Sequence, residues 1–409
     1  MLKDFKIIHD SIHGSIRIEE PLTSILEAPE MQRLSNVRQL GMNYLVFPGA
    51  NHTRFEHSLG VSYLSGEIGK SLDLEEKEIK MLKIAGLVHD IGHPPFSHTL
   101  EKYIKSKTGL DHVEIGAKIV RGEISAVDGL NEKSIKSIIE ENGIDTEEII
   151  SMFSKKSEDD IFGNRAKGKY LGRIINGDLD ADQLDYLLRD SHYTGVAYGI
   201  IDLQRILNTM TLLDNNIVFY DKGKEALESV MVARALMYSS VYFHKTARIA
   251  ELMLSRAIEQ LKDLDPMYII KMTDSELITK LLQSDGYARD IGNRIKYRHL
   301  FKKVAVFEKM PENFEFTNVS KLENEIAFEA DAPPGYVLID FPSEEISMSE
   351  PRLQYLDVKL LKNGKIVYLK DESNIVKALR TRKSIDYSLM VIAEKSYIEN
   401  VKKVIKRFF

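Results

Sequence analysis

Residues 87–98 of this 409-residue chain read LVHDIGHPPFSH, which places three histidines and one aspartate within twelve positions. The stretch continues a segment, EKEIKMLKIAG (76–86), whose apolar spacing predicts a buried helix. Charged and titratable side chains are costly to bury unless a partner or a metal ion satisfies them. Residues 87–98 therefore predict either hydrogen-bonded core histidines or a metal site at the end of an apolar helix.

The helix that leads into this stretch is predicted to end at Pro94-Pro95, because proline lacks the backbone N–H that a helix needs. His89 and His93 are four residues apart and so share a face of that helix, with Asp90 beside them. His98 follows the two prolines. It is therefore predicted to lie on a separate segment.

Histidines are concentrated around this stretch, since six of the eleven lie in the 61-residue window from 52 to 112. The six are His52, His57, His89, His93, His98 and His112. His57 is predicted near the start of a helix that covers 52–69. A further helix, 177–195, places Asp182, Tyr186 and Asp190 on one stripe at i, i+4 and i+8. Two histidines, an adjacent aspartate and a distant aspartate match the nitrogen and oxygen ligands of a divalent transition metal.

Roles as hydrogen-bonded core residues or surface residues are alternatives to the metal site. A single buried histidine is more often a hydrogen-bonded core residue than a ligand, which is the favoured interpretation for His57 or Asp182 taken alone. The clustering of His89, Asp90 and His93 favours a metal instead. Asp185 and Arg189 are four residues apart and are predicted to form a surface ion pair. The remaining histidines without ligand spacing are interpreted as structural or surface residues: His9, His13, His192 and His299.

Composition limits the class of protein. The chain is 43% hydrophobic and 29% charged, which is typical of a globular protein. It has no long uncharged apolar run and no apolar region at its N-terminus, so we expect neither a membrane span nor a secretory signal. The absence of cysteine excludes disulfides and thiolate ligands and favours a cytoplasmic location. A net charge of −6 disfavours general coating of nucleic acid.

The predicted fold class is mainly α. An N-terminal β-hairpin is expected at 5–18, and helices broken by loops rather than strands from about 20 to 300. The charged, glycine-containing stretch 154–170 is predicted to be a mobile loop. Beyond residue 303, strands are expected at 303–310 and 335–341, a hairpin at 355–369 that turns at Asn363-Gly364, and a final helix at 396–409. The predicted division is a helical core, 1–305, and a smaller α+β lobe, 306–409.

Three motifs in this order resemble the HD-domain superfamily of metal-dependent phosphohydrolases: TRFEHSLGV (53–61), LVHDIGHPPFSH (87–98) and DADQLDYLLRD (180–190). The longer stretch 8–61 resembles the deoxynucleoside triphosphate triphosphohydrolase branch, including dGTPase-like enzymes and the vertebrate dNTPases that carry a sterile-alpha-motif domain. The similarity extends through VYFHKTAR (241–248) and YRHLFKKV (297–304). It covers about residues 6–305.

The resemblance implies a reaction and its residues. The family cleaves the bond between deoxyribose O5′ and the α-phosphorus of a dNTP, and releases a nucleoside and inorganic triphosphate. The implied metal ligands are His57, His89, Asp90 and Asp182. The sequence does not distinguish Mg, Mn, Fe, Ni and Zn. His98 matches the proton donor to the leaving oxygen, a role that suits an imidazole.

The resemblance also implies substrate contacts. His93 and His112 would line the phosphate pocket, with Glu114 orienting a histidine, and Arg54 and Arg234 would neutralise the triphosphate, because guanidinium binds phosphate bidentately. The predicted catalytic residues are His98, His93, His112 and Asp182. The predicted contacts to deoxyribose are Gln39, Leu40, Tyr186, Asp190 and Tyr242.

Two departures from the family pattern concern charge. Gln183 stands where the family often has a phosphate-binding lysine. In the pattern for a regulatory nucleotide, Glu27 and Gln32 fit, but Ser35 replaces an arginine. Two further matches to that pattern are Arg298 and Lys302. The resemblance thus implies a dNTP substrate, an activating nucleotide and a homo-oligomer, either a dimer or a tetramer.

Two alternatives remain. The first is an HD phosphohydrolase that acts on another phosphoester, such as a nucleoside monophosphate, a cyclic nucleotide or single-stranded nucleic acid; the matches at Gln39, Arg234 and Tyr242 weigh against it. The second is a non-catalytic nucleotide sensor with a structural metal. Such a sensor has no need of a proton donor at His98.

Overall fold

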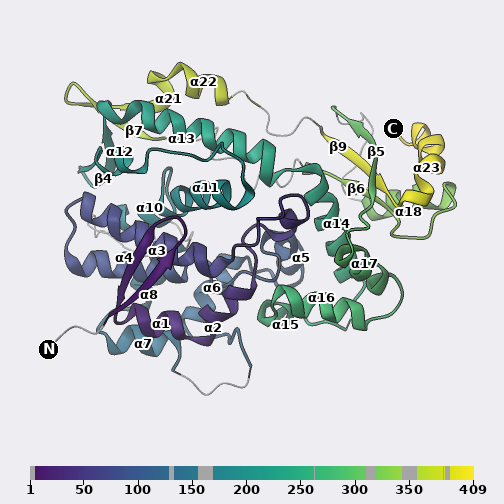
Figure 1. The fold of residues 1–409 in the computed structure, drawn as a ribbon, viewed down its shortest axis with the longest axis horizontal. Coiled ribbons are helices and arrows are strands. Elements are labelled where there is room, and N and C mark those ends of the chain that lie inside the picture. The colour runs from purple at the N-terminus through teal and green to yellow at the C-terminus, as the bar shows by residue number, and fades with distance from the viewer. Residues whose placement is uncertain are drawn as a thin grey trace.

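A computed structural model of the chain describes residues 5–128, 133–154, 169–261, 263–309, 319–342, 357–380, 382 and 387–409. Helices form most of the body, and the two larger sheets lie at opposite ends of it (Figure 1). Among the described residues, none of the helices has the length and apolar character needed to cross a bilayer. The predicted mainly α class is confirmed.

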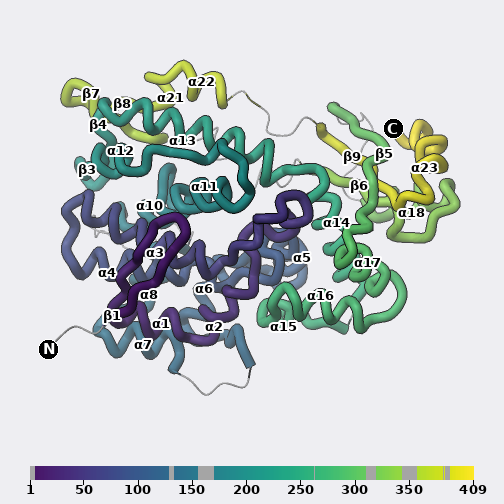
Figure 2. The backbone as a smooth tube through the Cα atoms, viewed as in Figure 1, coloured from purple at the N-terminus to yellow at the C-terminus, as the bar shows by residue number. Residues whose placement is uncertain are grey.

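The predicted N-terminal hairpin is present. Strands β1 (Phe5–Asp10) and β2 (Gly14–Glu19) pair in antiparallel register around Gly14, which has a φ of +73°. The hairpin crosses in front of the central helices (Figure 2), and the Ser11 hydroxyl at its turn lies 2.9 Å from the Tyr193 hydroxyl. The turn therefore contacts a helix that is distant in sequence.

Three helices form the centre of the fold: α3 (Arg54–Ser71), α4 (Glu76–Val88) and α11 (Ala181–Thr194). Helix α3 starts at a capping box, in which the Thr53 hydroxyl accepts from Glu56 N–H and the Glu56 carboxylate accepts from Thr53 N–H. Helices α3 and α11 approach closely at Gly60, where an added Cβ would overlap Asp185. Glycine is required there by packing.

Helix α4 ends at Val88, earlier than the prediction of an end at Pro94-Pro95. His89 is its C-cap, and residues 90–93 form turns, so the prediction that His89 and His93 share a helix face is wrong. The guanidinium of Arg33 donates to the carbonyls of Ile91 and His93 and stabilises these turns. Tertiary hydrogen bonds therefore terminate the helix before the prolines do.

The expectation of no strands before residue 300 is also wrong. Strands β3 (Met210–Leu213) and β4 (Asn216–Tyr220) form a hairpin whose turn residues, Asp214 and Asn215, both have positive φ. Strand β4 then pairs in parallel with β7 (Lys359–Lys362), and β7 pairs with β8 (Lys365–Tyr368). Strand β4 thus pairs with a strand that lies far along the chain, with Phe219 opposite Leu360, and local patterning does not reveal such a partner.

The segment 239–261 is divided rather than forming one helix. Helix α13 (Lys224–Met237) continues as a π-helical turn, Tyr238–Tyr242, and α14 (Lys245–Glu259) starts after Phe243 and His244. π-helical turns are frequent at functional sites. This turn carries Tyr242, a predicted sugar contact.

The C-terminal expectations are confirmed. Strands β5 (Lys302–Phe307), β6 (Val337–Asp340) and β9 (Leu389–Ala393) form an antiparallel sheet in the order β5-β9-β6. Helices α18 (Val319–Glu329) and α23 (Ile398–Val404) share a small apolar cluster with this sheet. The turn at Asn363-Gly364 joins β7 and β8.

The predicted loop 154–170 lies almost entirely outside the described residues, and helix α10 starts at Lys169. The other helices before residue 210 are α1 (Leu22–Glu27), α2 (Pro29–Arg33), α5 (His98–Thr108), α6 (His112–Val120), α7 (Ile135–Glu141), α8 (Thr146–Phe153), α10 (Lys169–Ile175) and α12 (Leu203–Leu207). Those after it are α15 (Pro266–Lys271), α16 (Asp274–Gln283), α17 (Gly286–Lys296), α21 (Leu369–Glu372) and α22 (Asn374–Arg380).

Candidate metal centre and active site

The four predicted metal ligands meet at the centre of the helical body. His57 comes from the first turns of α3, His89 and Asp90 from the end of α4, and Asp182 from the start of α11. Nε2 of His57 lies 3.0 Å from Asp182 Oδ1 and 3.7 Å from Asp90 Oδ2. Nε2 of His89 lies 3.3 Å from Asp90 Oδ1 and 3.9 Å from Asp182 Oδ1.

These groups fit a divalent metal ion. Ligand atoms that each lie about 2.0–2.2 Å from one ion are separated by distances of this order. Both imidazoles use Nδ1 elsewhere, His57 with Asp185 at 2.8 Å and His89 with the Gly86 carbonyl at 2.8 Å, so Nε2 is left for the ion. Nε2 of His89 is buried and has no hydrogen-bond partner among the described residues. The cluster can therefore hold a divalent metal.

The charges of the cluster are strongly coupled. Burial by itself lowers the pKa of His57, but hydrogen bonds to Asp182 and Asp185 outweigh it and raise the pKa to about 10. Burial raises the pKa of Asp90, yet Arg54 and the neighbouring histidines hold it well below its ordinary value. Asp90 is thus an anion at neutral pH, as a metal ligand must be.

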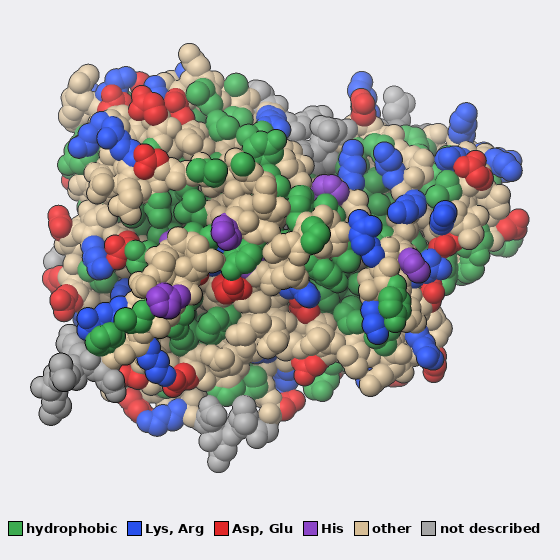
Figure 3. All heavy atoms as spheres, viewed as in Figure 1, with side chains coloured by type: hydrophobic (Ala, Val, Ile, Leu, Met, Phe, Trp, Pro, Cys, Tyr) green, Lys and Arg blue, Asp and Glu red, His purple; other side chains and the backbone are tan. Residues whose placement is uncertain are grey.

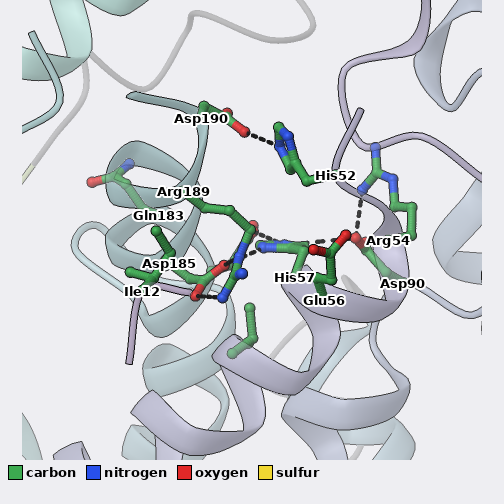
Figure 4. Close-up of polar contacts among 12 residues, drawn as sticks. Ile12, His52, Arg54, Glu56, His57, Asp90, Gln183, Asp185, Arg189 and Asp190 are labelled. Carbon is green, nitrogen blue, oxygen red and sulfur yellow. Dashed lines mark hydrogen bonds and ion pairs between the residues drawn. The ribbon is translucent and has the colours of Figure 1, made fainter. Parts of the chain in front are cut away.

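Asp185 and Arg189 form a buried pair, not the predicted surface pair. Both are fully buried, and Nε of Arg189 donates to Asp185 at 2.8 Å while its Nη1 donates to Asp10 at 2.8 Å. Nε2 of His13 lies 2.6 Å from Asp185. Figure 4 shows Asp185 and Arg189 gathered beside His57. The pair therefore connects the N-terminal hairpin to the metal ligand.

A second group of histidines adjoins the metal cluster. His93 is buried, with Nε2 3.4 Å from Asp90 Oδ1, and its ring stacks on that of His112 with centroids 4.0 Å apart. The His98 ring meets the His93 ring edge-on at 4.9 Å, and its side chain is 67% exposed. Each of His93, His98 and His112 offers a nitrogen within 4.8 Å of the others. Predicted catalytic histidines and predicted metal ligands thus form one continuous site.

The carboxylate that orients these histidines is Glu101, not Glu114. The Glu101 carboxylate accepts hydrogen bonds from Nδ1 of His98 at 2.7 Å and from Nδ1 of His112 at 2.5 Å. Burial raises the pKa of Glu101, but these two histidines hold it far below its ordinary value. Glu114 instead completes the capping box of α6 with Asp111. The i+3 spacing of Glu101 from His98 at the start of α5 was an available signal.

The two arginines predicted to bind triphosphate differ in their surroundings. Arg54 donates through Nη1 to Asp90 and through Nε to the Ser97 hydroxyl at 2.9 Å. Arg234 is fully buried on α13, and none of its guanidinium nitrogens completes a well-formed hydrogen bond with the described residues. Burial lowers its pKa, but Tyr186 and Tyr238 raise it more, so it stays charged. Its guanidinium lies over the Tyr238 ring, 5.5 Å from the ring centroid, and its buried N–H groups suit an anionic ligand.

The predicted sugar contacts lie on α11 and on the π-helical turn. The Tyr242 hydroxyl donates to Asp190 at 2.7 Å, and its ring meets the Tyr186 ring edge-on at 5.9 Å. His52, to which the sequence assigned no role, lies 2.8 Å from Asp190 through Nε2. Gln39 is buried, and its Oε1 has no partner among the described residues. Leu40 is partly buried and packs against the main core.

Gln183, which stands in the position of the family lysine, is fully buried, and neither its Oε1 nor its Nε2 has a partner among the described residues. Figure 4 shows its amide on a different side of α11 from His57. Gln183 therefore contributes no charge to the metal cluster.

Three of the four predicted regulatory residues have separate partners within the chain. Glu27 pairs with Lys6, the Gln32 amide donates to the Leu26 carbonyl at 2.8 Å, and Nε of Arg298 donates to the Leu45 carbonyl at 2.8 Å. Lys302 is exposed on β5. Lysine and arginine side chains gather over this end of the molecule, around β5 and α17 (Figure 3).

Two family descriptions match the chain. The HD domain matches residues 54–190, which contain all four candidate metal ligands, and the HD associated region matches residues 201–409. A crystal structure of a hypothetical protein from Aquifex aeolicus is similar, with a TM-score of 0.76 and 27% sequence identity over 98% of this chain and 100% of that chain.

Relatives cover most of the chain. The uncharacterized protein MJ1154 of Methanocaldococcus jannaschii is 39% identical over 309 residues, 74% of this chain and 60% of that protein. The uncharacterized protein YwfO of Bacillus subtilis is 29% identical over 95% of this chain and 92% of that protein. The deoxynucleoside triphosphate triphosphohydrolase SAMHD1 of Homo sapiens is 30% identical over 93% of this chain and 64% of that protein.

The chain therefore spans less than two thirds of the length of MJ1154 and of human SAMHD1. The resemblance inferred from the three motifs is confirmed, because proteins named as SAMHD1 dNTP triphosphohydrolases align with most of the chain at about 30% identity. The HD associated region alone matches more than half of the 409 residues and follows an HD domain that contains the His–Asp cluster. The chain belongs to the family of HD-domain proteins that carry an HD associated region.

Proposed function

We propose that this protein is a metal-dependent dNTP triphosphohydrolase that releases a deoxynucleoside and inorganic triphosphate. The proposal rests on the contact between the candidate metal cluster and the neighbouring group of histidines, His93, His98 and His112. His93 lies 3.4 Å from the metal-ligand carboxylate of Asp90 and stacks on His112, which shares Glu101 with His98. The candidate metal cluster and the proposed proton donor therefore adjoin each other, which supports the proposal.

The reaction requires a polarised phosphorus, an attacking water and a protonated leaving oxygen. A divalent metal on His57, His89, Asp90 and Asp182 supplies Lewis acidity and lowers the pKa of a bound water when present. His98 donates a proton to O5′ as the bond from O5′ to phosphorus breaks. Glu101 accepts from Nδ1 of His98, which leaves Nε2 to face the substrate.

The remaining residues bind and orient the nucleotide. Burial, Arg54 and His112 lower the pKa of His93 well below its ordinary value, so His93 is neutral and acts as a hydrogen-bonding group rather than a charge. Arg234 offers phosphate oxygens a buried guanidinium whose N–H groups complete no well-formed hydrogen bond with the described residues. The Asp190–Tyr242 pair and Gln39 would provide polar groups for the sugar hydroxyl, and by the family resemblance Leu40 would exclude a 2′-hydroxyl.

The test is a panel of the four dNTPs and four NTPs, incubated with metal-depleted protein to which Mn²⁺, Mg²⁺, Fe²⁺, Ni²⁺ or Zn²⁺ is added. The expected products are nucleoside and tripolyphosphate in equal amounts, separated by ion-exchange chromatography. Release of pyrophosphate or orthophosphate as the first product would exclude this function. Asp182→Ala should remove metal and turnover together, while Asp178→Ala, on the loop before α11, serves as the matched control.

A homo-oligomer, an activating nucleotide and a cytoplasmic location are part of the same proposal, supported by the resemblance to the dNTPase branch. Repeating the panel with GTP or a second dNTP tests activation, and sedimentation velocity with and without nucleotide tests assembly. A second panel tests the alternative substrates: a nucleoside monophosphate, a cyclic nucleotide and single-stranded nucleic acid. A protein that binds dNTPs without turning over any of them would be the nucleotide sensor.

A further inference from the structure

The residues immediately before His98 have an unusual backbone. Phe96 and Ser97 both have positive φ, +57° and +54°, and ψ of Ser97 is −124°. Neither residue is glycine, so each conformation is unfavourable and persists only where surrounding contacts enforce it. Both side chains are buried. Because this turn leads directly into the first residue of α5, it sets where the His98 imidazole lies.

A carboxylate from the HD associated region holds this turn. Oδ1 of Asp274, the first residue of α16, accepts from Phe96 N–H at 2.7 Å, although 178 residues separate the two. Asp274 is only 3% exposed. It is not needed as a helix cap, because Thr273 and Glu276 already form the capping box of α16. Its buried carboxylate therefore serves the turn rather than its own helix.

The second oxygen of Asp274 holds the segment that carries the predicted sugar contacts. Oδ2 accepts from Arg38 N–H at 3.1 Å and from Arg38 Nη1 at 3.3 Å, and Arg38 directly precedes Gln39. The same segment passes close to the turn, because a Cβ added to Gly41 would lie 2.8 Å from the Phe96 carbonyl oxygen. One carboxylate thus connects two segments of the proposed active site.

A chain of hydrogen bonds leads from the Phe96–Ser97 turn to the candidate metal cluster. The Ser97 hydroxyl donates to the Arg38 carbonyl at 2.7 Å and accepts from Nε of Arg54 at 2.9 Å. Arg54 in turn donates to Asp90. Burial raises the pKa of Asp274, while its bonds to Phe96 and Arg38 oppose that rise, so the carboxylate depends on these partners.

We propose that Asp274 is a positioning residue for the reaction: by holding the Phe96–Ser97 turn in its left-handed conformation, it places the His98 imidazole where the leaving oxygen needs a proton. The inference rests on the proposed function. It also connects the HD associated region to the proposed proton donor, since Asp274 lies within residues 201–409. A small displacement of a proton donor lowers turnover by about 10- to 100-fold.

The experiment is a double-mutant cycle. Asp274→Ala should lower kcat for dNTP hydrolysis about 10- to 100-fold in the wild-type background and cause no further loss in the His98→Ala background, because the two residues act as a unit. Metal affinity, measured by calorimetry, should be unchanged in Asp274→Ala. Losses that multiply in the double variant would overturn the proposal. Asp274→Asn keeps one acceptor oxygen and is expected to retain activity between that of Asp274→Ala and that of the wild type.

Two controls separate positioning from folding. Glu276→Ala removes the carboxylate of the same capping box but touches neither Phe96 nor Arg38. It should lower thermal stability and leave kcat near the wild-type value. An equal loss of kcat in Glu276→Ala and Asp274→Ala would mean that α16 stability, not the turn, is responsible.

A measurement without substrate distinguishes failure of this inference from failure of the proposed function. In protein labelled with ¹³C-histidine, the His98 resonance is assigned by its loss in His98→Ala. That resonance should shift in Asp274→Ala and stay in place in Glu276→Ala. An unshifted His98 resonance would refute the positioning role, whereas a wild-type protein that releases no tripolyphosphate from any dNTP would refute the function.

Discussion

Nδ1 of His57 lies 2.8 Å from Oδ2 of Asp185, and both side chains are fully buried. This contact selects Nε2 of His57 as the nitrogen that faces the metal cluster, because the carboxylate holds the other ring nitrogen. Asp185 is itself held by Arg189 and by His13 of the hairpin. The orientation of the His57 ring therefore depends on contacts with the N-terminal hairpin.

Asp185→Asn should weaken metal binding. The change keeps the shape of the side chain but removes the charge that orients His57, and loss of such a partner typically lowers metal affinity about 10- to 100-fold. Titration calorimetry with Mn²⁺ measures the affinity. Asp202→Asn, which alters the N-cap of α12 by a residue that caps equally well, should bind metal as the wild type does. Wild-type affinity in Asp185→Asn would contradict the role of this contact.

Gly60→Ala should destabilise the protein and disturb the same contact. A Cβ at this position overlaps Asp185 Oδ1 and Arg189 Nη2, neither of which can move without breaking a buried ion pair. Overpacking of this kind costs about 1–3 kcal/mol or more. Gly172 lies on α10, and a methyl added there would have the Met152 carbonyl oxygen of α8 as its nearest neighbour, at 3.6 Å, so Gly172→Ala is expected to give a small gain in stability. Chemical denaturation of both variants provides the comparison.

Metal binding should release protons at neutral pH. In the metal-free site the pKa of His57 is raised from 6.5 to about 10, so its imidazole carries a proton that a metal ligand must lose. Calorimetry in buffers of different ionisation enthalpy should detect about one proton released per ion at pH 7.5. Because the folded-state pKa is raised, the stability that protonated His57 contributes to the metal-free protein is complete below pH 6.5. It is lost as the pH rises through about 10. No proton release, or metal-free stability that rises across this window, would argue against a protonated His57.

Glu101→Gln should lower kcat about tenfold or more, since general acid catalysis contributes about 10²–10⁴-fold and this carboxylate orients the proposed acid. Metal affinity should not change, because Glu101 contacts His98 and His112 and not the metal cluster. Glu114→Gln is the matched control, since glutamine also completes a capping box at this position of α6. Steady-state kinetics should find the control at wild-type kcat. Equal losses in the two variants would assign the effect to helix capping.

The sequence motifs pointed to the candidate metal ligands because such ligands must be particular residue types at helix positions that face one another. His57, His89, Asp90 and Asp182 were identified from residue type and spacing together with the family resemblance, and the structure brings them together. The hairpin at Gly14 and the turn at Asn363-Gly364 were predictable for a related reason. Their backbone conformations require glycine or asparagine, so the residues themselves reveal the turn.

What the sequence by itself determined, then, is the mainly α class, the N-terminal hairpin, the C-terminal strands and the composition of the metal cluster. Only the tertiary structure decided that α4 ends at Val88, that Asp185 and Arg189 are buried, and that Glu101 orients the histidines. It also decided that Asp274 holds the turn before His98. The physical reason is that a buried carboxylate is satisfied by whichever donors the packing of distant segments brings to it, and those donors leave no periodic pattern along the chain.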